Sequence, residues 1–328
     1  MEDSGDMVSQ PDVWPGPVGR PGRAHWWSAQ PAPPAPRITA RRAYTEVLGV
    51  FAAFFAASII AGGETFAGRY PPPSGSWAVF TPATVSELGT CVLAVLVTVL
   101  LSGRRGIRPG WLGLRWPRRR DGRAGAVQSM RIGVWAIAAL LAGGATTSAL
   151  AMGNKLGQPA HQDASYLIYT LAASLTAGVV EEMVVLAFVI TTLRQAGRPT
   201  AEILLVAVLL RCSYHDYYGL GVIGIAVWAT VFVWLFLRTG SVLPLIVVHV
   251  LWDANIFLGQ RWHEVQVATA YVWIMLVLIA AITWLVELQA RYRGPPPGDP
   301  AGPSHVVIPP PAATTGAPAF DPPAPDRT

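Results

Sequence analysis

Long apolar stretches recur along most of the chain, with shorter polar segments between them. They are longer than the strands of a soluble domain and are not one-sided like its amphipathic helices. A transmembrane helix needs about 20 mostly apolar residues. The pattern therefore predicts an all-α polytopic membrane bundle of about eight spans. The expected spans are Ala43–Gly62, Thr84–Leu101, Ile132–Met152, Leu167–Leu193, Glu202–Tyr214, Val222–Leu237, Leu243–Leu258 and Ala268–Leu288.

Basic residues are concentrated in every second predicted loop. They crowd the N-terminal flank, the second, fourth and sixth loops and the C-terminal flank, whereas the other loops hold only Arg69, Lys155 and Arg261. The positive-inside rule therefore places both termini in the cytoplasm, which requires an even number of spans. This supports Glu202–Tyr214, which is short and interrupted by Arg211. The net charge of +5 thus indicates topology rather than nucleic-acid binding.

The two ends of the chain have little apolar content and are rich in Pro, Gly and Ala. We expect disordered cytoplasmic tails there. Pro31–Pro36 and Pro309–Pro311 could bind a partner as polyproline II, although a plain solvated tail is the simpler interpretation. No removable signal peptide is recognised. The expected divisions are a tail at 1–41, spans one to three with a basic loop at 103–131 in 42–165, spans four to seven in 166–258, the last span in 259–293, and a tail at 294–328.

Two adjacent carboxylates, Glu181 and Glu182, interrupt the apolar run Ser174–Ile190. Each costs roughly 2.5–3.5 kcal/mol at the centre of a membrane helix on insertion scales, and such groups normally face a protein interior or a wet cavity. Ser174 and Gly178 precede them at intervals of three or four, so these residues share a helix face. Small residues let membrane helices approach closely. We therefore expect both carboxylates to face the bundle.

Two further polar clusters fall in later spans. Arg211 and His215 are four residues apart, as are His249 and Asp253, so each pair shares a helix face. Taken singly, an intramembrane His can be a satisfied helix–helix hydrogen bond, and Arg211 can simply neutralise a Glu. The set of two Glu, two His and an Asp on three helices is a constellation that hydrolytic chemistry could use.

Four polar residues lie where the fifth span ends, and an interfacial position accounts for them. They are Tyr214, Asp216, Tyr217 and Tyr218.

The three clusters together resemble the CPBP (CAAX protease and bacteriocin-processing, or Abi) family of intramembrane proteases. That family carries EExxxR, FxxxH and HxxxN/D on successive helices of an eight-span bundle. The corresponding segments here are Glu181–Leu186, Arg211–His215 and His249–Asp253. The resemblance covers Tyr166–Leu258 and implies an endopeptidase that hydrolyses a peptide bond in a membrane-associated protein or peptide.

Two positions depart from the family pattern. Leu186 stands where the first motif ends in Arg, and Arg211 stands where the second begins with Phe. We hypothesise that the guanidinium has moved between helices, so that Arg211 pairs with Glu182. The alternative is that loss of the family Arg marks an inactive relative.

By resemblance, Glu181 is the general base and Glu182 supports it. His215, His249 and Asp253 would hold the water and supply donors to the oxyanion. Such proteins have been described both as metal-free and as zinc enzymes, and Glu181, His215 and His249 could instead ligate zinc. We favour the metal-free mechanism.

Two other classes of function remain open. A non-catalytic scaffold or immunity protein could use the same polar cluster structurally, and a transporter could use it as a proton relay. Against a transporter, no internal repeat is evident. The Arg-rich, Lys-poor composition suggests a bacterial plasma membrane and makes a prenylated substrate less attractive than another membrane peptide. The side from which substrate enters is left open.

Overall fold

The computed structural model describes residues 37–66, 77–114, 122–151 and 164–292, and every regular element in these ranges is helical. Most of both predicted tails lies outside them, as do Pro31–Pro36 and Pro309–Pro311. The helices are α1 (Ala40–Phe66), α2 (Trp77–Arg104), η1 (Pro109–Leu112), α3 (Gly122–Leu150), α4 (Ala164–Thr176), η2 (Ala177–Ile190), α5 (Thr191–Gln195), α6 (Thr200–Ser213), η3 (Asp216–Gly221), α7 (Val222–Thr239), α8 (Leu243–Arg261) and α9 (His263–Tyr292).

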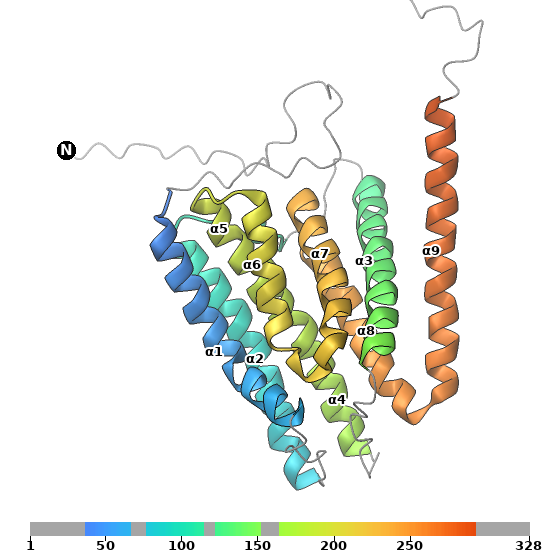
Figure 1. Cartoon of the computed structure of the whole chain (residues 1–328), viewed down its shortest axis with the longest axis horizontal. Helices are drawn as coiled ribbons and strands as arrows, with labels where there is room; N and C mark the ends of the chain where they lie inside the picture. Colours follow the sequence, from blue (N-terminus) through green and yellow to red (C-terminus); the bar gives the residue numbers. More distant parts are fainter. Residues whose placement is uncertain (1–36, 67–76, 115–121, 152–163, 293–328) are drawn as a thin grey trace, which may run out of the picture. The chain divides into compact units, whose positions relative to one another are not determined.

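The predicted membrane bundle is confirmed. The eight predicted spans fall on α1, α2, α3, the continuous rod α4–η2–α5, α6, α7, α8 and α9 (Figure 1). Among the described residues, six helical segments are long and apolar enough to cross a membrane, and the apolar part of α8, Leu243–Gly259, is shorter. The helix of the weakest predicted span, α6, has 14 residues. The orientation of the bundle remains a prediction.

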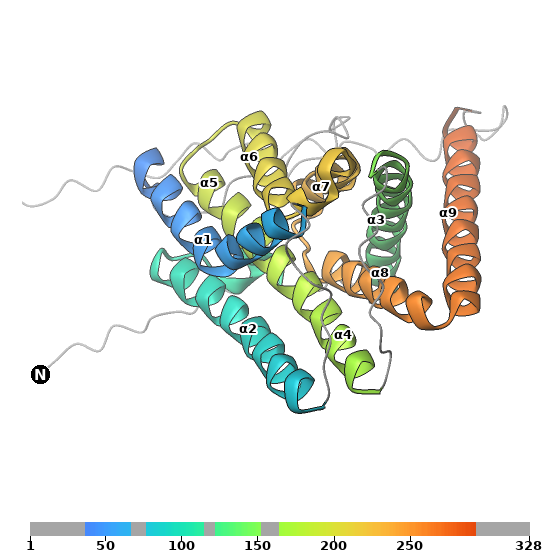
Figure 2. The ribbon, with the colours of Figure 1, turned by 60° about the horizontal axis from the view of Figure 1, so that its bottom comes forward.

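The rod α4–η2–α5 forms the centre of the bundle. Of its most apolar stretch, 72% is buried, against 17% for α2 and 6% for α9. Its middle segment, η2, contacts α1, α2, α6, α7 and α8, and Figure 2 shows the rod passing between α1 and α2 on one side and α7 and α8 on the other. Residues up to Ala281 form one compact unit, and the end of α9 belongs to a second. The polar residues of the rod are therefore held inside protein.

Helices α3 and α7 meet at glycines. A Cβ atom on Gly143 would lie 2.6 Å from the carbonyl oxygen of Gly224, so the two backbones are in direct contact. The Thr147 hydroxyl donates to the carbonyl of Gly221 at 3.0 Å. Small residues and a hydroxyl bond of this kind are typical of helix packing in membranes. This contact fixes α7, which lines the site described below.

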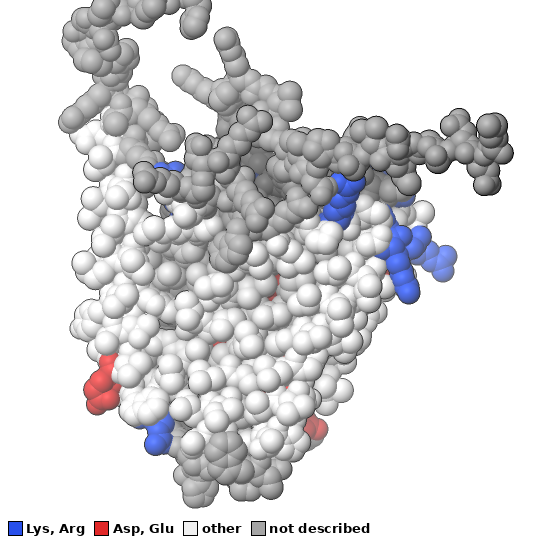
Figure 3. Space-filling view, turned by 180° about the vertical axis from the view of Figure 1, so that it is seen from behind, with Lys and Arg blue, Asp and Glu red and all other residues white. Residues whose placement is uncertain are grey.

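Charged side chains are concentrated near the helix ends. On the face in Figure 3 most described residues are uncharged, and the larger groups of Lys, Arg, Asp and Glu appear toward its ends. At one end the buried Arg105 places Nη1 3.1 Å from Glu46 Oε2 and donates from Nη2 to Thr192 Oγ1 at 2.9 Å. This network joins α1, the end of α2 and α5.

Candidate active site

The carboxylates lie on a widened helix. Segment η2 is a π-helix of 14 residues, in which each N–H reaches the carbonyl five residues earlier rather than four. Both Glu181 and Glu182 are buried. Gly178 lies against α8, since a Cβ there would be 2.9 Å from the backbone nitrogen of Val250. The small residue that predicted close helix packing thus brings α8, with His249, against the carboxylates.

Arg211 of α6 lies between the two carboxylates. Its Nη1 and Nη2 donate to Glu182 Oε1 and Oε2 at 2.8 and 3.0 Å, and Nη1 is 3.4 Å from Glu181 Oε2. The guanidinium carbon lies 4.6 Å from the centroid of the Trp228 ring. Arg211 and Glu182 are both fully buried. The hypothesised pairing of Arg211 with Glu182 is therefore present, while Leu186 is buried in the apolar core.

His249 of α8 joins the same carboxylates from the other side. Its Nδ1 is 2.7 Å from Glu182 Oε1, and because a carboxylate accepts, Nδ1 carries the hydrogen. Its Nε2 lies 3.5 Å from Asp253 Oδ2 and 4.0 Å from Glu181 Oε2. The side chain of Asp253 is 23% exposed. Glu182 thus accepts bonds from two helices, α6 and α8, in each case from a charged or chargeable donor.

His215 follows the end of α6, and its ring is oriented by the backbone. Its Nδ1 is 2.9 Å from the carbonyl oxygen of Arg211. A carbonyl can only accept, so Nδ1 bears the hydrogen and Nε2 of the neutral ring is an acceptor. The ring centroids of His215 and His249 lie 6.5 and 5.3 Å from that of Trp228. Residues from two of the three predicted clusters therefore lie around one indole, and Arg211 joins them to the carboxylates.

Tyr214 lies in the candidate site and not at the membrane interface that the sequence predicted for it. Tyr214 was expected at the membrane interface, but it is only 5% exposed, and its Oη donates to Glu181 Oε2 at 2.9 Å. The expectation was wrong because a hydroxyl at the end of a span can also turn inward to a buried acceptor. Helical spacing carried the signal, since Tyr214 follows Arg211 by three positions. Asp216, Tyr217 and Tyr218 are partly exposed.

The described side chains do not form a ready ligand set for a metal. Within these residues, no three His, Cys, Asp or Glu side chains are arranged to hold an ion. In the zinc set considered above, Glu181 is instead engaged by Tyr214 and Arg211 through Oε2. The Arg211 guanidinium beside both carboxylates would also repel a dication. We therefore derive no step through a metal, and the metal-free mechanism stays a prediction.

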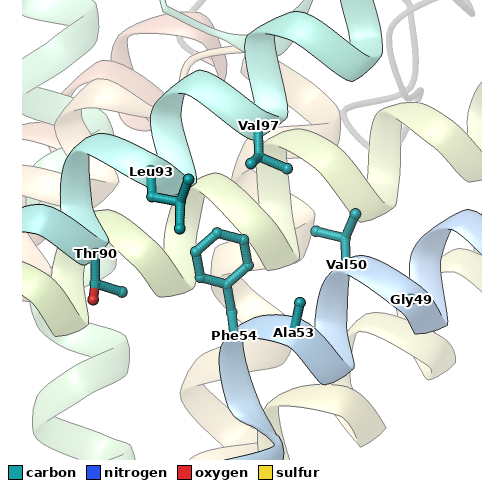
Figure 4. Close-up of a pocket in the computed structure, with 7 residues that line it drawn as sticks. All are labelled: Gly49, Val50, Ala53, Phe54, Thr90, Leu93 and Val97. Carbon is teal, nitrogen blue, oxygen red and sulfur yellow. The ribbon is translucent and has the colours of Figure 1, made fainter.

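An apolar pocket lies apart from this site, between α1 and α2 (Figure 4). Its lining residues are Gly49, Val50, Ala53, Phe54, Thr90, Leu93 and Val97. Because this lining contains no titratable side chain, the pocket does not supply the chemistry.

Comparison with known proteins identifies the same region. Residues 163–255 match the model of a family described as type II CAAX prenyl endopeptidase Rce1-like. Searches of curated proteins and of solved structures gave no significant match. The matched segment contains Glu181, Glu182, Arg211 and both histidines, together with Asp253, and nearly coincides with the predicted Tyr166–Leu258. The match supports membership of the CAAX-protease (CPBP) family of membrane proteases for this segment, as its three ordered motifs predicted.

Proposed function

We propose that the protein is an intramembrane endopeptidase that uses Glu181 to activate a water against a peptide bond of a membrane-associated protein or peptide. The observation that carries the proposal is the unequal engagement of the two adjacent carboxylates. Glu182 accepts two bonds from Arg211 and one from His249. Glu181 has donors only on Oε2, from Tyr214 and Arg211. Among the described residues its Oε1 has no protein partner, and the side chain retains 11% exposure.

These contacts suit Glu181 for proton transfer and Glu182 for support. In the proposed step, Glu181 Oε1 takes a proton from water while the water oxygen bonds to the scissile carbonyl carbon. The proton then passes to the leaving nitrogen as the C–N bond breaks. Glu182, saturated with donors, holds α6, η2 and α8 in register instead of reacting. Proton transfer by a positioned side chain contributes about 10²–10⁴-fold to a rate.

The histidines have different parts in this proposal. His215 Nε2, left as an acceptor by the bond from Nδ1 to Arg211, can hold the second hydrogen of the water. His249 Nε2 faces Asp253 and Glu181 and, when it carries a proton, is the donor available to the oxyanion. In a buried site of low dielectric such fixed donors stabilise developing charge more than they would in water.

The proposed reaction is metal-free. Arg211 already supplies a fixed positive charge next to both carboxylates, at 2.8 Å from Glu182 and 3.4 Å from Glu181. That charge stabilises the carboxylate form without a metal. The pairing supports activity despite Leu186, because α6 supplies a guanidinium next to Glu182.

The chain is a multi-pass membrane protein, and we propose the bacterial plasma membrane as its location. The matched family is described as a CAAX prenyl endopeptidase. The Arg-rich, Lys-poor composition is typical of a bacterial chain, and a bacterial origin favours an unprenylated membrane peptide as the substrate. Nucleic acid is not among the proposed partners.

The test uses the full-length protein in liposomes with two internally quenched peptides. One carries a single apolar helix of about 20 residues, and the other is soluble apart from an S-farnesyl cysteine three residues before its C terminus. We expect the wild type to cleave the first, and Glu181→Gln to lower its kcat about 100-fold or more. Glu87→Gln on α2, a partly exposed carboxylate far along the chain from the motifs, is the matched control.

Full activity in Glu181→Gln would refute the assignment of the base. A wild type that cleaves neither peptide, with a cellular phenotype that Glu181→Gln leaves intact, would favour a scaffold or immunity protein. Proton flux into the same liposomes, abolished by Glu181→Gln, would favour a transporter.

A further inference from the structure

We propose that Tyr214 is a positioning residue for Glu181: its hydroxyl anchors Oε2, so that Oε1 is the oxygen presented to the water. This inference rests on the proposed role of Glu181 as the base. It concerns a residue outside the three family motifs as they are written, because Tyr214 occupies one of the variable positions between Arg211 and His215.

The geometry gives Tyr214 the stronger hold on Glu181. Its Oη lies 2.9 Å from Glu181 Oε2, whereas Arg211 Nη1 lies 3.4 Å from the same oxygen and 2.8 Å from Glu182. The guanidinium is thus committed mainly to Glu182. The terminal torsion of a Glu is broad and nearly two-fold, so a carboxylate without an anchor exchanges its two oxygens freely. The Tyr214 donor at 2.9 Å on Oε2 restricts that exchange.

The phenol ring is itself fixed from outside the matched segment. It stacks on Phe55 of α1 with centroids 4.3 Å apart and planes at 14°, and Phe51 lies 6.0 Å away. The centroid of the His215 ring lies 4.6 Å from that of Tyr214. Phe51 and Phe55 are both buried. Helix α1, which the family match at 163–255 does not include, therefore takes part in holding the base.

A merely structural role would have a different signature. A buried Tyr hydroxyl needs a partner, and the bond to Glu181 could serve only to satisfy it. Removing such a bond would change stability without changing turnover. Positioning instead acts on kcat, because a base that is misplaced by about 1 Å can cost about 100-fold in rate.

The first test is Tyr214→Phe, which keeps the ring stacked on Phe55 and removes only the hydroxyl. With whichever quenched peptide is cleaved, we expect kcat to fall about 10- to 100-fold, as for a lost bond to a charged group, and KM to stay within about twofold. The matched control is Tyr44→Phe. The Tyr44 hydroxyl on α1 also donates to a Glu, Glu202 on α6, away from the candidate site. We expect wild-type kcat from this control.

The second readout does not depend on turnover. The infrared difference between wild type and Glu181→Gln isolates the carboxyl band of Glu181, and we expect Tyr214→Phe to shift that band while Tyr44→Phe leaves it in place. An unchanged band, or unchanged kcat in Tyr214→Phe beside an inactive Glu181→Gln, would overturn the inference and leave the proposed function standing. An active Glu181→Gln would instead overturn the proposed function and the inference together.

Discussion

Replacing Arg211 with Met is expected to lower the free energy of unfolding by about 3–5 kcal/mol, the cost of leaving one partner of a buried ion pair alone. The magnitude follows from the contacts. Glu182 is 0% exposed and receives both of its guanidinium bonds from this one side chain, at 2.8 and 3.0 Å. Met fills much of the same volume, so the loss reports the charge and the hydrogen bonds more than a cavity. We expect proteolysis to be lost as well, because Glu182 no longer fixes α6 against η2.

A double-mutant cycle isolates the pair. Glu182→Met is expected to be destabilising for the same reason, since it leaves the Arg211 cation buried. In Arg211→Met/Glu182→Met both charges are gone. The loss of unfolding free energy in the double variant should therefore be smaller than the sum of the two single losses by about 1–3 kcal/mol. The measurement is equilibrium unfolding in mixed micelles, followed by tryptophan fluorescence. Trp228 is a suitable reporter because its ring lies 4.6 Å from the guanidinium carbon.

A relocation variant tests whether position matters or only charge. Arg211→Phe/Leu186→Arg restores the family pattern at both positions, and residue 186 lies about one helical turn from Glu182. We expect it to recover part of the stability and proteolysis lost in Arg211→Phe. A different result would refute the pairing as the source of stability: Arg211→Met lowers the unfolding free energy by less than about 1 kcal/mol, and its effect adds to that of Glu182→Met. Effects of two substitutions add when the residues do not interact.

Three further perturbations follow from the same structure. Gly178→Ala should lower the free energy of unfolding by about 1–3 kcal/mol through overpacking and reduce proteolysis by pushing α8 away from η2. The control Gly89→Ala, with open space at its Cβ, should do neither. Thermal unfolding and the peptide assay measure both effects. Arg105→Met should destabilise the protein more than Arg42→Met. Both cations contact Glu46, but their side chains are 3% and 61% exposed, and exposed ion pairs contribute only about 0–1 kcal/mol. The free energies of unfolding of the two variants in micelles test this. A zinc chelator should leave proteolysis unchanged, and a loss restored by added zinc would contradict the metal-free mechanism.

The presence of the helices could be predicted from the sequence, but their arrangement could not. Apolar runs of membrane length placed every predicted span on a helix, with ends up to ten residues from those observed. The same pattern did not distinguish the rod α4–η2–α5, mostly buried, from α9, almost wholly exposed in its apolar part. In a membrane the solvent is as apolar as the core, so hydropathy has no preference between a lipid-facing and a protein-facing helix. Only the polar residues of Ser174–Ile190 indicated which helix is central.

The site was predictable where spacing alone sets it. Intervals of four placed Arg211 with His215 and His249 with Asp253, and the cost of a buried carboxylate implied a cation near Glu182. Tyr214 was missed because its partner is on another helix. Its spacing of three from Arg211 places both on one face, but that spacing does not show whether the hydroxyl meets lipid headgroups or a buried Glu. The contribution of Phe55 was missed for the same reason.

The departure at Leu186 illustrates what a motif records. A motif fixes the position of a charge along the chain, whereas the carboxylate responds only to the position of that charge in space. Arg211 meets Glu182 from α6, and it does so in the motif position where the family has Phe, one turn before Tyr214 and His215, which directly follow the helix. In the proposed mechanism, α6 and the two residues after it would thus supply the cation for the supporting carboxylate, the anchor for the reacting one and an acceptor for water. A change at Arg211 should therefore disturb the site more widely than a change at any residue of η2 except the two carboxylates themselves.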